Sequence, residues 1–369
     1  MERVAFIYWG RRGSLSQFTL ELAEASERQR LVDATFSVSR NNESFDIFAP
    51  LGDRIVPVDT FAPTHGALSR IYRVPTLRQT MLDMVARRRI QWVVNLMPHV
   101  WSPFVTPAIR AAGARYAAVV HDARRHPGDH RGLVNWWTLR DARNAELLFT
   151  LSSAVSRELQ SAPAFGASRI VSLQHPELTY GQAARARHYD PSRPIRLMFL
   201  GRIMPYKGLG NFLDMIGNLR AVGLPVEFGV FGEGTLGANG ARIAALGGEI
   251  INRWMAAGEL PVLLDRFDAV VLSHIEASQS GVVATAHGAG MPVVATPVGG
   301  LVEQIRDGQT GILAERADGA ALAQAVLRLV QTPGLYDRIA ANILRCRAGQ
   351  SMESFLSRVV ENLAAMPPR

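Results

Sequence analysis

The order of apolar segments constrains the fold of this chain more than any other feature of its sequence. Short apolar runs of strand length alternate with stretches of helical period, first over residues 4–172 and again over 195–330. Strands that alternate with helices form βαβ units around a mainly parallel sheet. The candidate strands cover residues 4–9, 35–39, 92–97, 116–120, 147–151 and 169–172 in the first set, and 195–200, 226–231, 269–272 and 292–295 in the second. We therefore predict an α/β protein with two doubly wound domains that face each other across a cleft.

A polar stretch separates the two sets. It carries several arginines and two prolines, a composition typical of a linker between domains. The length of 369 residues also exceeds what one hydrophobic core usually organises. We expect an N-terminal domain over residues 1–180, a linker over 181–194 and a C-terminal domain over 195–348. An amphipathic helix in residues 349–369 could pack back on the N-terminal domain.

The composition describes a soluble globular protein, with 48% hydrophobic and 20% charged residues. No apolar run approaches the roughly 20 residues that span a bilayer, and the run at 4–9 is too short for a signal peptide. Cys346 is the single cysteine, which favours a cytoplasmic location without disulfides. The net charge of +8 indicates an anionic partner, such as a nucleoside diphosphate, an anionic membrane face or nucleic acid.

Lys207 is the only lysine among the 40 lysines and arginines of the chain. It lies with Arg202 in the loop that follows the candidate strand 195–200. Ligands of open α/β sheets bind at the carboxyl ends of strands. An arginine fork and a lysine point charge together suit the neutralisation of a diphosphate. The alternative is a solvated loop with two surface cations.

A glycine-rich loop follows the next strand, 226–231. Its glycines fit G-x-G-x-x-G, a pattern that brings backbone close to a phosphate or a sugar. No acidic residue ends a strand about 20 residues later, as a dinucleotide site would require; Arg253 and Trp254 occupy that region. We predict donor contacts for Gly232, Gly234, Arg253 and Trp254, with a plain tight turn as the alternative.

The stretch from Leu272 to Glu303 is the densest in candidate site residues. A strand delivers Glu276, whose carboxylate can bind sugar hydroxyls, to a polar loop. Ser280 and Gly281 then open a helix, and helix N-terminal amides bind phosphate oxygens. These residues are therefore predicted at the same donor site.

The order and spacing of these motifs resemble family 4 of the retaining glycosyltransferases, which have the GT-B fold of two Rossmann-like domains. The resemblance covers the whole second domain. It rests on Gly201-Arg202 with Lys207-Gly208, the Glu276 loop, Gly290-x-Pro292, Gly299-Gly300 with Glu303, and Asp307-Gly308-x-x-Gly311. In the first domain it is limited to the loop of residues 10–13 and to Val120-His121-Asp122 with His126-Pro127-Gly128.

The resemblance implies a metal-independent, retaining transfer of a hexose from a nucleoside-diphosphate sugar, without a further cofactor. Arg202 and Lys207 would stabilise the leaving diphosphate, and Glu276 would hold hydroxyls of the donor sugar. His121 would act in the cleft as a catalytic residue, unless it is a structural histidine that caps a strand. Gly10 and Gly13 are assigned to the donor as well. No Asp-x-Asp motif is present, and the spacing of Asp122, His126 and His130 fits no standard zinc site.

One position departs from the family pattern. The family commonly carries a second glutamate eight residues after the first, often on the donor ribose, and this position is Ala284, followed by Thr285. The nucleotide base, the sugar and the linkage therefore stay open.

The acceptor is expected at the first domain, as a glycan or a polyprenyl-linked molecule, in polysaccharide biosynthesis. Its predicted contacts are Arg11, Arg12, Arg124, Arg125 and Arg131. Tryptophans at 136 and 137 among arginines suit a peripheral contact with an anionic membrane, although a helix with buried tryptophans explains them equally well. Basic residues interleaved with aromatics are confined to this region, so we expect no nucleic acid.

Two other functions fit the same fold. A nucleotide-sugar epimerase of GT-B fold should have a cleft rich in carboxylates, whereas this chain has the cation pair. A non-enzymatic sugar-nucleotide binding protein would bind the donor without turnover.

Overall fold

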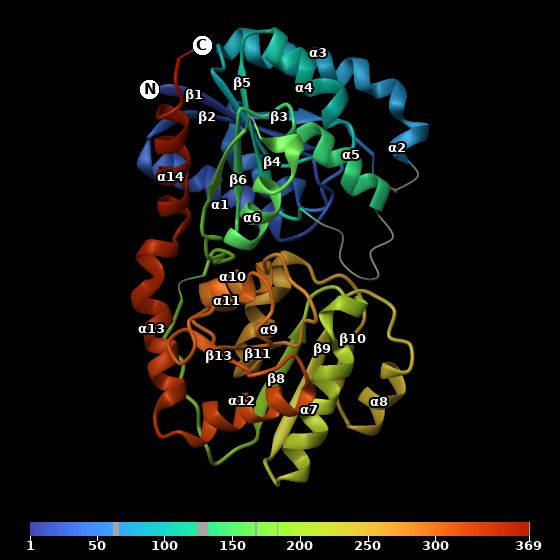
Figure 1. Cartoon of the computed structure of the whole chain (residues 1–369), viewed down its shortest axis with the longest axis vertical. Coiled ribbons are helices and arrows are strands. Elements are labelled where there is room, and N and C mark those ends of the chain that lie inside the picture. Colours follow the sequence, from blue (N-terminus) through green and yellow to red (C-terminus); the bar gives the residue numbers. More distant parts are fainter. Residues whose placement is uncertain (62–65, 124–131, 167, 183, 369) are drawn as a thin grey trace. The chain divides into compact units, whose positions relative to one another are not determined.

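The computed structural model describes residues 1–61, 66–123, 132–166, 168–182 and 184–368. These residues form two compact units (Figure 1). The first contains the described residues up to Gln174 and returns from Met352 onward, and the second runs from His175 to Ser351. Among the described residues, no helix is both long and apolar enough to cross a bilayer.

The described part of the first unit has a seven-stranded sheet in the order β3-β2-β1-β4-β5-β6-β7. All neighbouring strands pair in parallel. The strands are β1 (Glu2–Tyr8), β2 (Val32–Ser39), β3 (Ile55–Val58), β4 (Trp92–Met97), β5 (Arg115–Val120), β6 (Leu147–Thr150) and β7 (Arg169–Ser172). The strand order reverses between β1 and β4, and the carboxyl ends of strands at such a switch point are where α/β proteins bind ligands.

Helices connect these strands. They are α1 (Ser14–Gln29), α2 (Gly66–Ser69), α3 (Val74–Arg88), α4 (Ser102–Ala111), α5 (Gly132–Ala142) and α6 (Ser153–Gln160), with short 3-10 turns that include η2 (Ile71–Arg73). α14 (Met352–Ala364) belongs to this unit and packs on α1, with the rings of Phe18 and Phe355 5.2 Å apart. Arg28 and Glu353 add an ion pair of 2.6 Å between the same two helices.

The described part of the second unit has a six-stranded parallel sheet in the order β10-β9-β8-β11-β12-β13. The strands are β8 (Ile195–Leu200), β9 (Val226–Phe231), β10 (Glu249–Ile251), β11 (Ala269–Leu272), β12 (Val293–Ala295) and β13 (Gly311–Leu313). The helices are α7 (Leu209–Ala221), α8 (Asn239–Ala245), α9 (Leu260–Arg266), α10 (Gly281–Gly288), α11 (Leu301–Gln304), α12 (Gly319–Gln331) and α13 (Leu335–Gln350). The switch point lies between β8 and β11.

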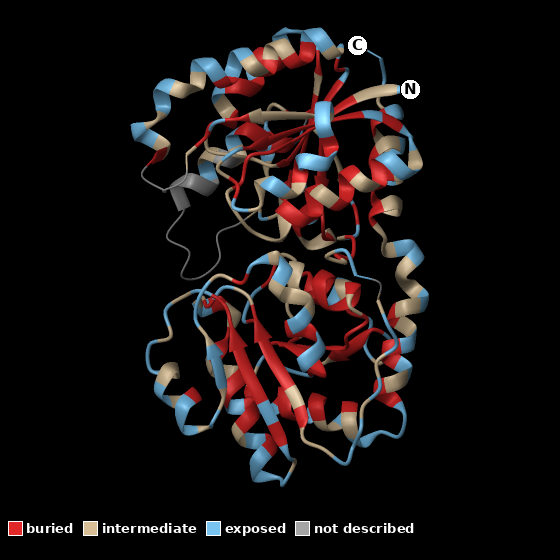
Figure 2. Ribbon diagram, turned by 180° about the vertical axis from the view of Figure 1, so that it is seen from behind, coloured by how far each residue is buried: buried red, intermediate tan, exposed pale blue. Residues whose placement is uncertain are grey.

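Each face of the second sheet has its own core. Leu197 and Phe199 of β8 belong to a cluster shared with α7 and α12, and Met198 and Leu200 belong to a cluster shared with α9 and α10. Successive side chains of a strand point to opposite faces. A strand covered on both sides must therefore be apolar at every position. Figure 2 shows the result as buried strands in both units, with helices that expose only their outer sides.

Residues 181–194, expected to link the domains, belong instead to the second unit and pack on it. The Arg187 guanidinium donates to the carbonyls of Leu264, Phe267 and Ala289, at 3.1 Å each, and only 10% of its side chain is exposed. Arg193 forms a two-pronged ion pair with buried Asp268, at 2.7 Å for each contact. The polar composition that suggests a linker therefore serves buried hydrogen bonds.

Candidate functional site

Two loops of the second unit run side by side after the neighbouring strands β8 and β9. The Gly201 N–H donates to the Phe231 carbonyl at 2.9 Å, and the Ile203 N–H donates to the Glu233 carbonyl at 2.8 Å. A Cβ at Gly232 would lie 2.0 Å from the Gly201 oxygen, and one at Gly234 would lie 2.1 Å from the Ile203 oxygen. These two glycines are therefore required for the pairing of the loops, whatever ligand they meet.

Arg202 is exposed on the first of these loops. Arg253 lies in the segment after β10 and forms an ion pair of 2.6 Å with Glu259, which holds the pKa of that carboxyl at about 2. The Gly234 N–H donates to Asn252 at 3.1 Å, so this segment also contacts the glycine loop. Arg202 and Arg253 thus come from consecutive loops at the carboxyl edge of the sheet.

Lys207 is held by residues that follow the adjacent strand β11. Its ammonium nitrogen lies 2.7 Å from Nε2 of buried His274, and its carbonyl accepts from the Ser273 hydroxyl at 3.1 Å. An ammonium can only donate, so Nε2 of His274 accepts and the imidazole is neutral. Gly208 (φ 66°) allows the close approach, because a Cβ there would lie 1.9 Å from the Ser273 oxygen.

His274 was not predicted from the sequence. The available signal is its position two residues before Glu276, in a loop that directly follows a buried strand.

The loop of Glu276 joins the same edge. The Ile275 N–H donates to the Tyr206 carbonyl at 2.7 Å, and the Ala277 carbonyl accepts from the Gly300 N–H at 2.9 Å. A Cβ at Gly299 would lie 1.7 Å from the Ala277 oxygen, so the Gly299-Gly300 turn packs against the loop. Glu276 itself is exposed. The loops after β8, β11 and β12 therefore contact one another and place Lys207 and Glu276 on connected segments.

Ser280 caps α10, but its backbone is directed at a neighbour. The Ser280 hydroxyl accepts from the Val282 N–H at 3.3 Å, and the Ser280 N–H donates to the Gln304 side chain at 2.7 Å. The Gln304 amide in turn donates to the Ser280 carbonyl at 3.1 Å. The predicted contact of the Ser280 amide with a phosphate or sugar thus competes with Gln304, whereas the prediction for Gly281 meets no such partner among these contacts.

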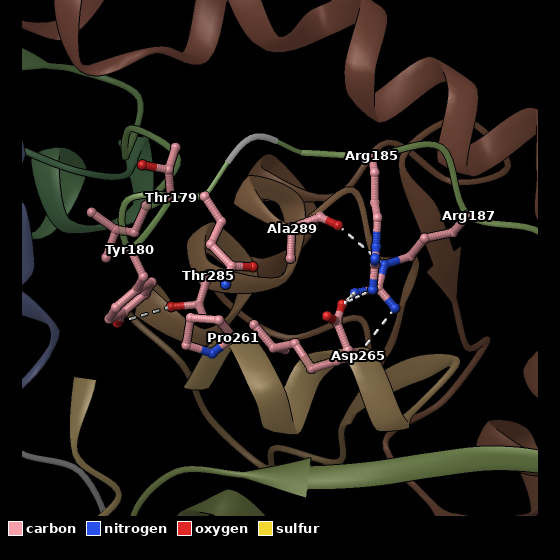
Figure 3. Close-up of a pocket in the computed structure, with 11 residues that line it drawn as sticks. Thr179, Tyr180, Arg185, Arg187, Pro261, Asp265, Thr285 and Ala289 are labelled. Atoms are coloured by element: carbon pink, nitrogen blue, oxygen red, sulfur yellow. Dashed lines mark hydrogen bonds and ion pairs between the residues drawn. The ribbon is translucent and has the colours of Figure 1, made fainter. Parts of the chain in front are cut away.

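The position of the missing second glutamate lies beneath residues 178–180. Ala284 is buried, and its carbonyl accepts from the Leu178 N–H at 3.1 Å. The Thr285 hydroxyl donates to the Gly281 carbonyl at 2.9 Å and lies 3.4 Å from the Tyr180 hydroxyl. Thr285 lines a pocket of about 280 Å³, shown in Figure 3, where two arginines of the strap at 181–194 converge on Asp265.

In the first unit, the loop after β1 is fixed by side chains. A Cβ at Gly10 would lie 2.6 Å from the Tyr8 ring, and the Gly10 carbonyl accepts from Asn42 at 2.8 Å. Gly13 adopts φ 126° and precedes α1 as its N-cap. Arg11 and Arg12 share the Glu43 carboxylate, at 3.0 and 3.8 Å. The loop is therefore ordered, with its donor and acceptor roles still predictions.

His121 follows β5. Its Nε2 donates to the Leu96 carbonyl at 2.8 Å, and burial lowers the pKa of the imidazole. The ring is neutral on this reading, and its Nδ1 can then accept a hydrogen bond from a hydroxyl. The predicted acceptor residues Arg124, Arg125 and Arg131 lie outside the described residues, as do His126 and His130. Within the described ranges, no group of three or more His, Cys, Asp or Glu side chains could hold a metal ion.

Comparisons with known proteins place part of this chain in a family. Residues 194–332, which include Arg202, Lys207 and Glu276, match the family "Glycosyl transferases group 1". A D-inositol 3-phosphate glycosyltransferase of a Nocardioides strain is 30% identical over 209 residues, which are 47% of this chain and 44% of that protein. The chain thus spans less than half the length of the first relatives that it matches. The 2-deoxystreptamine glucosyltransferase of Streptomyces kanamyceticus is 26% identical over 357 residues, 85% of this chain and 87% of that protein.

Solved structures resemble the chain along nearly its whole length. Anabaena Alr3699/HepE in complex with UDP-glucose superposes with a TM-score of 0.71 at 15% identity and covers 99% of this chain and 100% of that one. Sucrose-phosphate synthase of Thermosynechococcus elongatus superposes with a TM-score of 0.72 at 14% identity, with the same coverage. The fold is therefore GT-B, with two Rossmann-like domains, as the sequence predicts.

Proposed function

We propose that this chain is a glycosyltransferase that moves a hexose from a nucleoside-diphosphate sugar to a glycan or a polyprenyl-linked acceptor. The observation that carries the proposal is the match of residues 194–332, within which the loops of Arg202, Lys207 and Glu276 meet at one edge of the sheet. The Anabaena neighbour was solved with UDP-glucose, so uridine nucleotide sugars are the first donors to test. The transfer is proposed to retain the anomeric configuration and to need no metal.

The donor is assigned to the second unit. Lys207 and Arg202 stabilise the charge that builds on the leaving diphosphate, and His274 holds the Lys207 ammonium in place for this role. Glu276 binds hydroxyls of the donor sugar. The leaving phosphate serves as the base for attack from the same face, so no protein nucleophile is required.

The acceptor is assigned to the first unit. Nδ1 of His121 accepts a hydrogen bond from an acceptor hydroxyl, since its Nε2 is committed to Leu96. Arg11 and Arg12 supply positive charge at the loop after β1, where a phosphorylated acceptor would profit from it. Arg124, Arg125 and Arg131 are retained as candidate acceptor contacts from the sequence alone.

The test is a donor screen with the purified full chain. UDP-, GDP- and ADP-sugars are incubated without an acceptor, and the release of free sugar and nucleoside diphosphate is followed by chromatography. A glycosyltransferase should hydrolyse one donor slowly and release both products. Interconversion of sugar epimers with the nucleotide still attached would support the epimerase instead, and tight donor binding without any turnover would support a binding protein.

Glu276→Gln is expected to lower turnover roughly 10- to 100-fold, the usual loss for a hydrogen bond to a charged group. Affinity for the bare nucleoside diphosphate should stay nearly unchanged, because the carboxylate is assigned to the sugar. Initial rates and calorimetric binding of the diphosphate measure the two effects. Glu227→Gln, on an exposed residue near the start of β9, is the matched control. A large loss of diphosphate affinity would move Glu276 to the nucleotide, in place of the glutamate missing at Ala284.

A further inference from the structure

Large apolar side chains are exposed on one side of the first unit. In the described residues they lie on α2, η2, α4 and α5, whose arrangement can be followed in Figure 1. The exposed fractions are 80% for Leu68, 45% for Ile71, 68% for Tyr72, 42% for Phe104 and 54% for Trp136. Single exposed apolar residues are common, but a contiguous group of them marks an interaction surface.

Hydrogen bonds from tryptophans show that these elements are neighbours. The Trp101 indole N–H donates to the Ala67 carbonyl of α2 at 3.0 Å, and the Trp137 indole N–H of α5 donates to the Val100 carbonyl at 2.7 Å. Val100 and Trp101 are consecutive, so α2 and α5 are tied to one point of the chain. The rings of Phe104 and Trp137 are 5.3 Å apart. The five exposed side chains therefore belong to one surface, which we call the apolar patch.

The buried end of α5 is anchored in the core. Asp141 is fully buried and accepts from the Thr106 hydroxyl at 2.6 Å, from Asn95 at 3.4 Å and from the Tyr116 hydroxyl. These partners come from α4, β4 and β5. Because the carboxylate joins α5 to three other elements, the exposure of Trp136 is a consequence of a defined helix position.

Positive charge surrounds the apolar patch. From Gly66 to His121 the only acidic residue is Asp83, and it lies 4.0 Å from Arg87. The Arg73 guanidinium lies 6.0 Å from the Tyr72 ring, and the Arg140 guanidinium lies 5.8 Å from the Trp137 ring. Arginine that flanks exposed tyrosine and tryptophan suits the interface of an anionic membrane, where apolar rings enter the headgroup layer and guanidinium groups bind lipid phosphate.

We propose that the apolar patch inserts into the headgroup layer of an anionic membrane leaflet, with Arg70, Arg73 and Arg140 contacting lipid phosphates. The inference rests on the membrane contact expected from the sequence but assigns it to different residues. It needs no donor and no turnover, so it can be tested separately from the proposed transfer.

The experiment is cosedimentation of the full chain with vesicles of phosphatidylcholine alone or mixed with phosphatidylglycerol, at low salt. We expect binding to the mixed vesicles, at least a tenfold loss of bound protein for the double variant Leu68→Ser/Tyr72→Ser, and no loss for Leu31→Ser. Leu31 is the control because it is 41% exposed in the same unit but precedes β2, away from the patch. Added salt should weaken binding, since exposed charges are screened over about 8 Å at physiological ionic strength.

Trp136 provides a direct reading of insertion. Brominated phosphatidylcholine in the mixed vesicles should quench the fluorescence of the wild type, and Trp136→Phe should lose most of that quenching while it stays folded by circular dichroism. Equal binding of the double variant and the wild type would overturn the proposal, as would absence of wild-type binding at low salt. Self-association that the double variant abolishes would assign the patch to a second copy of the chain. Donor hydrolysis without vesicles is measured in parallel, so a missing activity cannot be mistaken for a missing membrane surface.

Discussion

Lys207→Ala is expected to lower the rate of sugar transfer by about 10²–10³-fold, the usual cost of removing one preorganised donor from a developing anion. The ammonium is positioned by His274 at 2.7 Å, and the lysine backbone is tied to Ser273, so the charge is in place before the donor binds. The variant should remain folded, because Lys207 is only partly buried. Initial rates at saturating donor, with thermal unfolding beside them, measure the effect.

Two further variants separate charge from packing at the same place. Lys207→Arg should recover only part of the rate, because a planar fork does not reproduce a compact ammonium next to an imidazole. Arg338→Ala, which removes an exposed cation from α13, should leave the rate unchanged. Near-wild-type transfer by Lys207→Ala would remove the lysine from the catalytic residues, however the donor binds.

Gly232→Ala is expected to lower the free energy of unfolding by roughly 3 kcal/mol or more, at the upper end of the range for overpacked sites. Its Cβ would lie 2.0 Å from the Gly201 oxygen, a backbone atom that cannot rotate away. The loop of Arg202 would have to move with it, so transfer should fall as well. Denaturant unfolding of the full chain measures the stability term.

Gly237→Ala is the matched control, since Gly237 also has a positive φ of 53° but no atom within 4 Å of the added Cβ. It should cost only about 1–2 kcal/mol, the strain of the left-handed conformation. Equal losses in the two variants would show that the conformation, rather than the pairing of the loops, explains Gly232.

The sequence predicted the inner strands of both sheets well, because a strand buried on both faces must be a continuous apolar run. β1 and β8 are of this kind. The strands that it missed are β3, β10 and β13, each at an end of its sheet. They have three or four residues, and β3 contains Pro57. Such short segments become strands because a neighbour supplies the hydrogen bonds, and a local pattern does not contain that information.

At the candidate site the division is similar. The sequence alone singled out Lys207, because it is the one lysine of the chain, and Glu276, because it follows a buried strand. Only the tertiary structure identified His274 as the partner of Lys207 and directed the Ser280 amide to Gln304. It also assigned Gly232 and Gly234 to loop pairing and brought residues 181–194 onto the second unit. These outcomes depend on atoms that are distant in the chain, whereas residue type and apolar period are local properties that a sequence carries by itself.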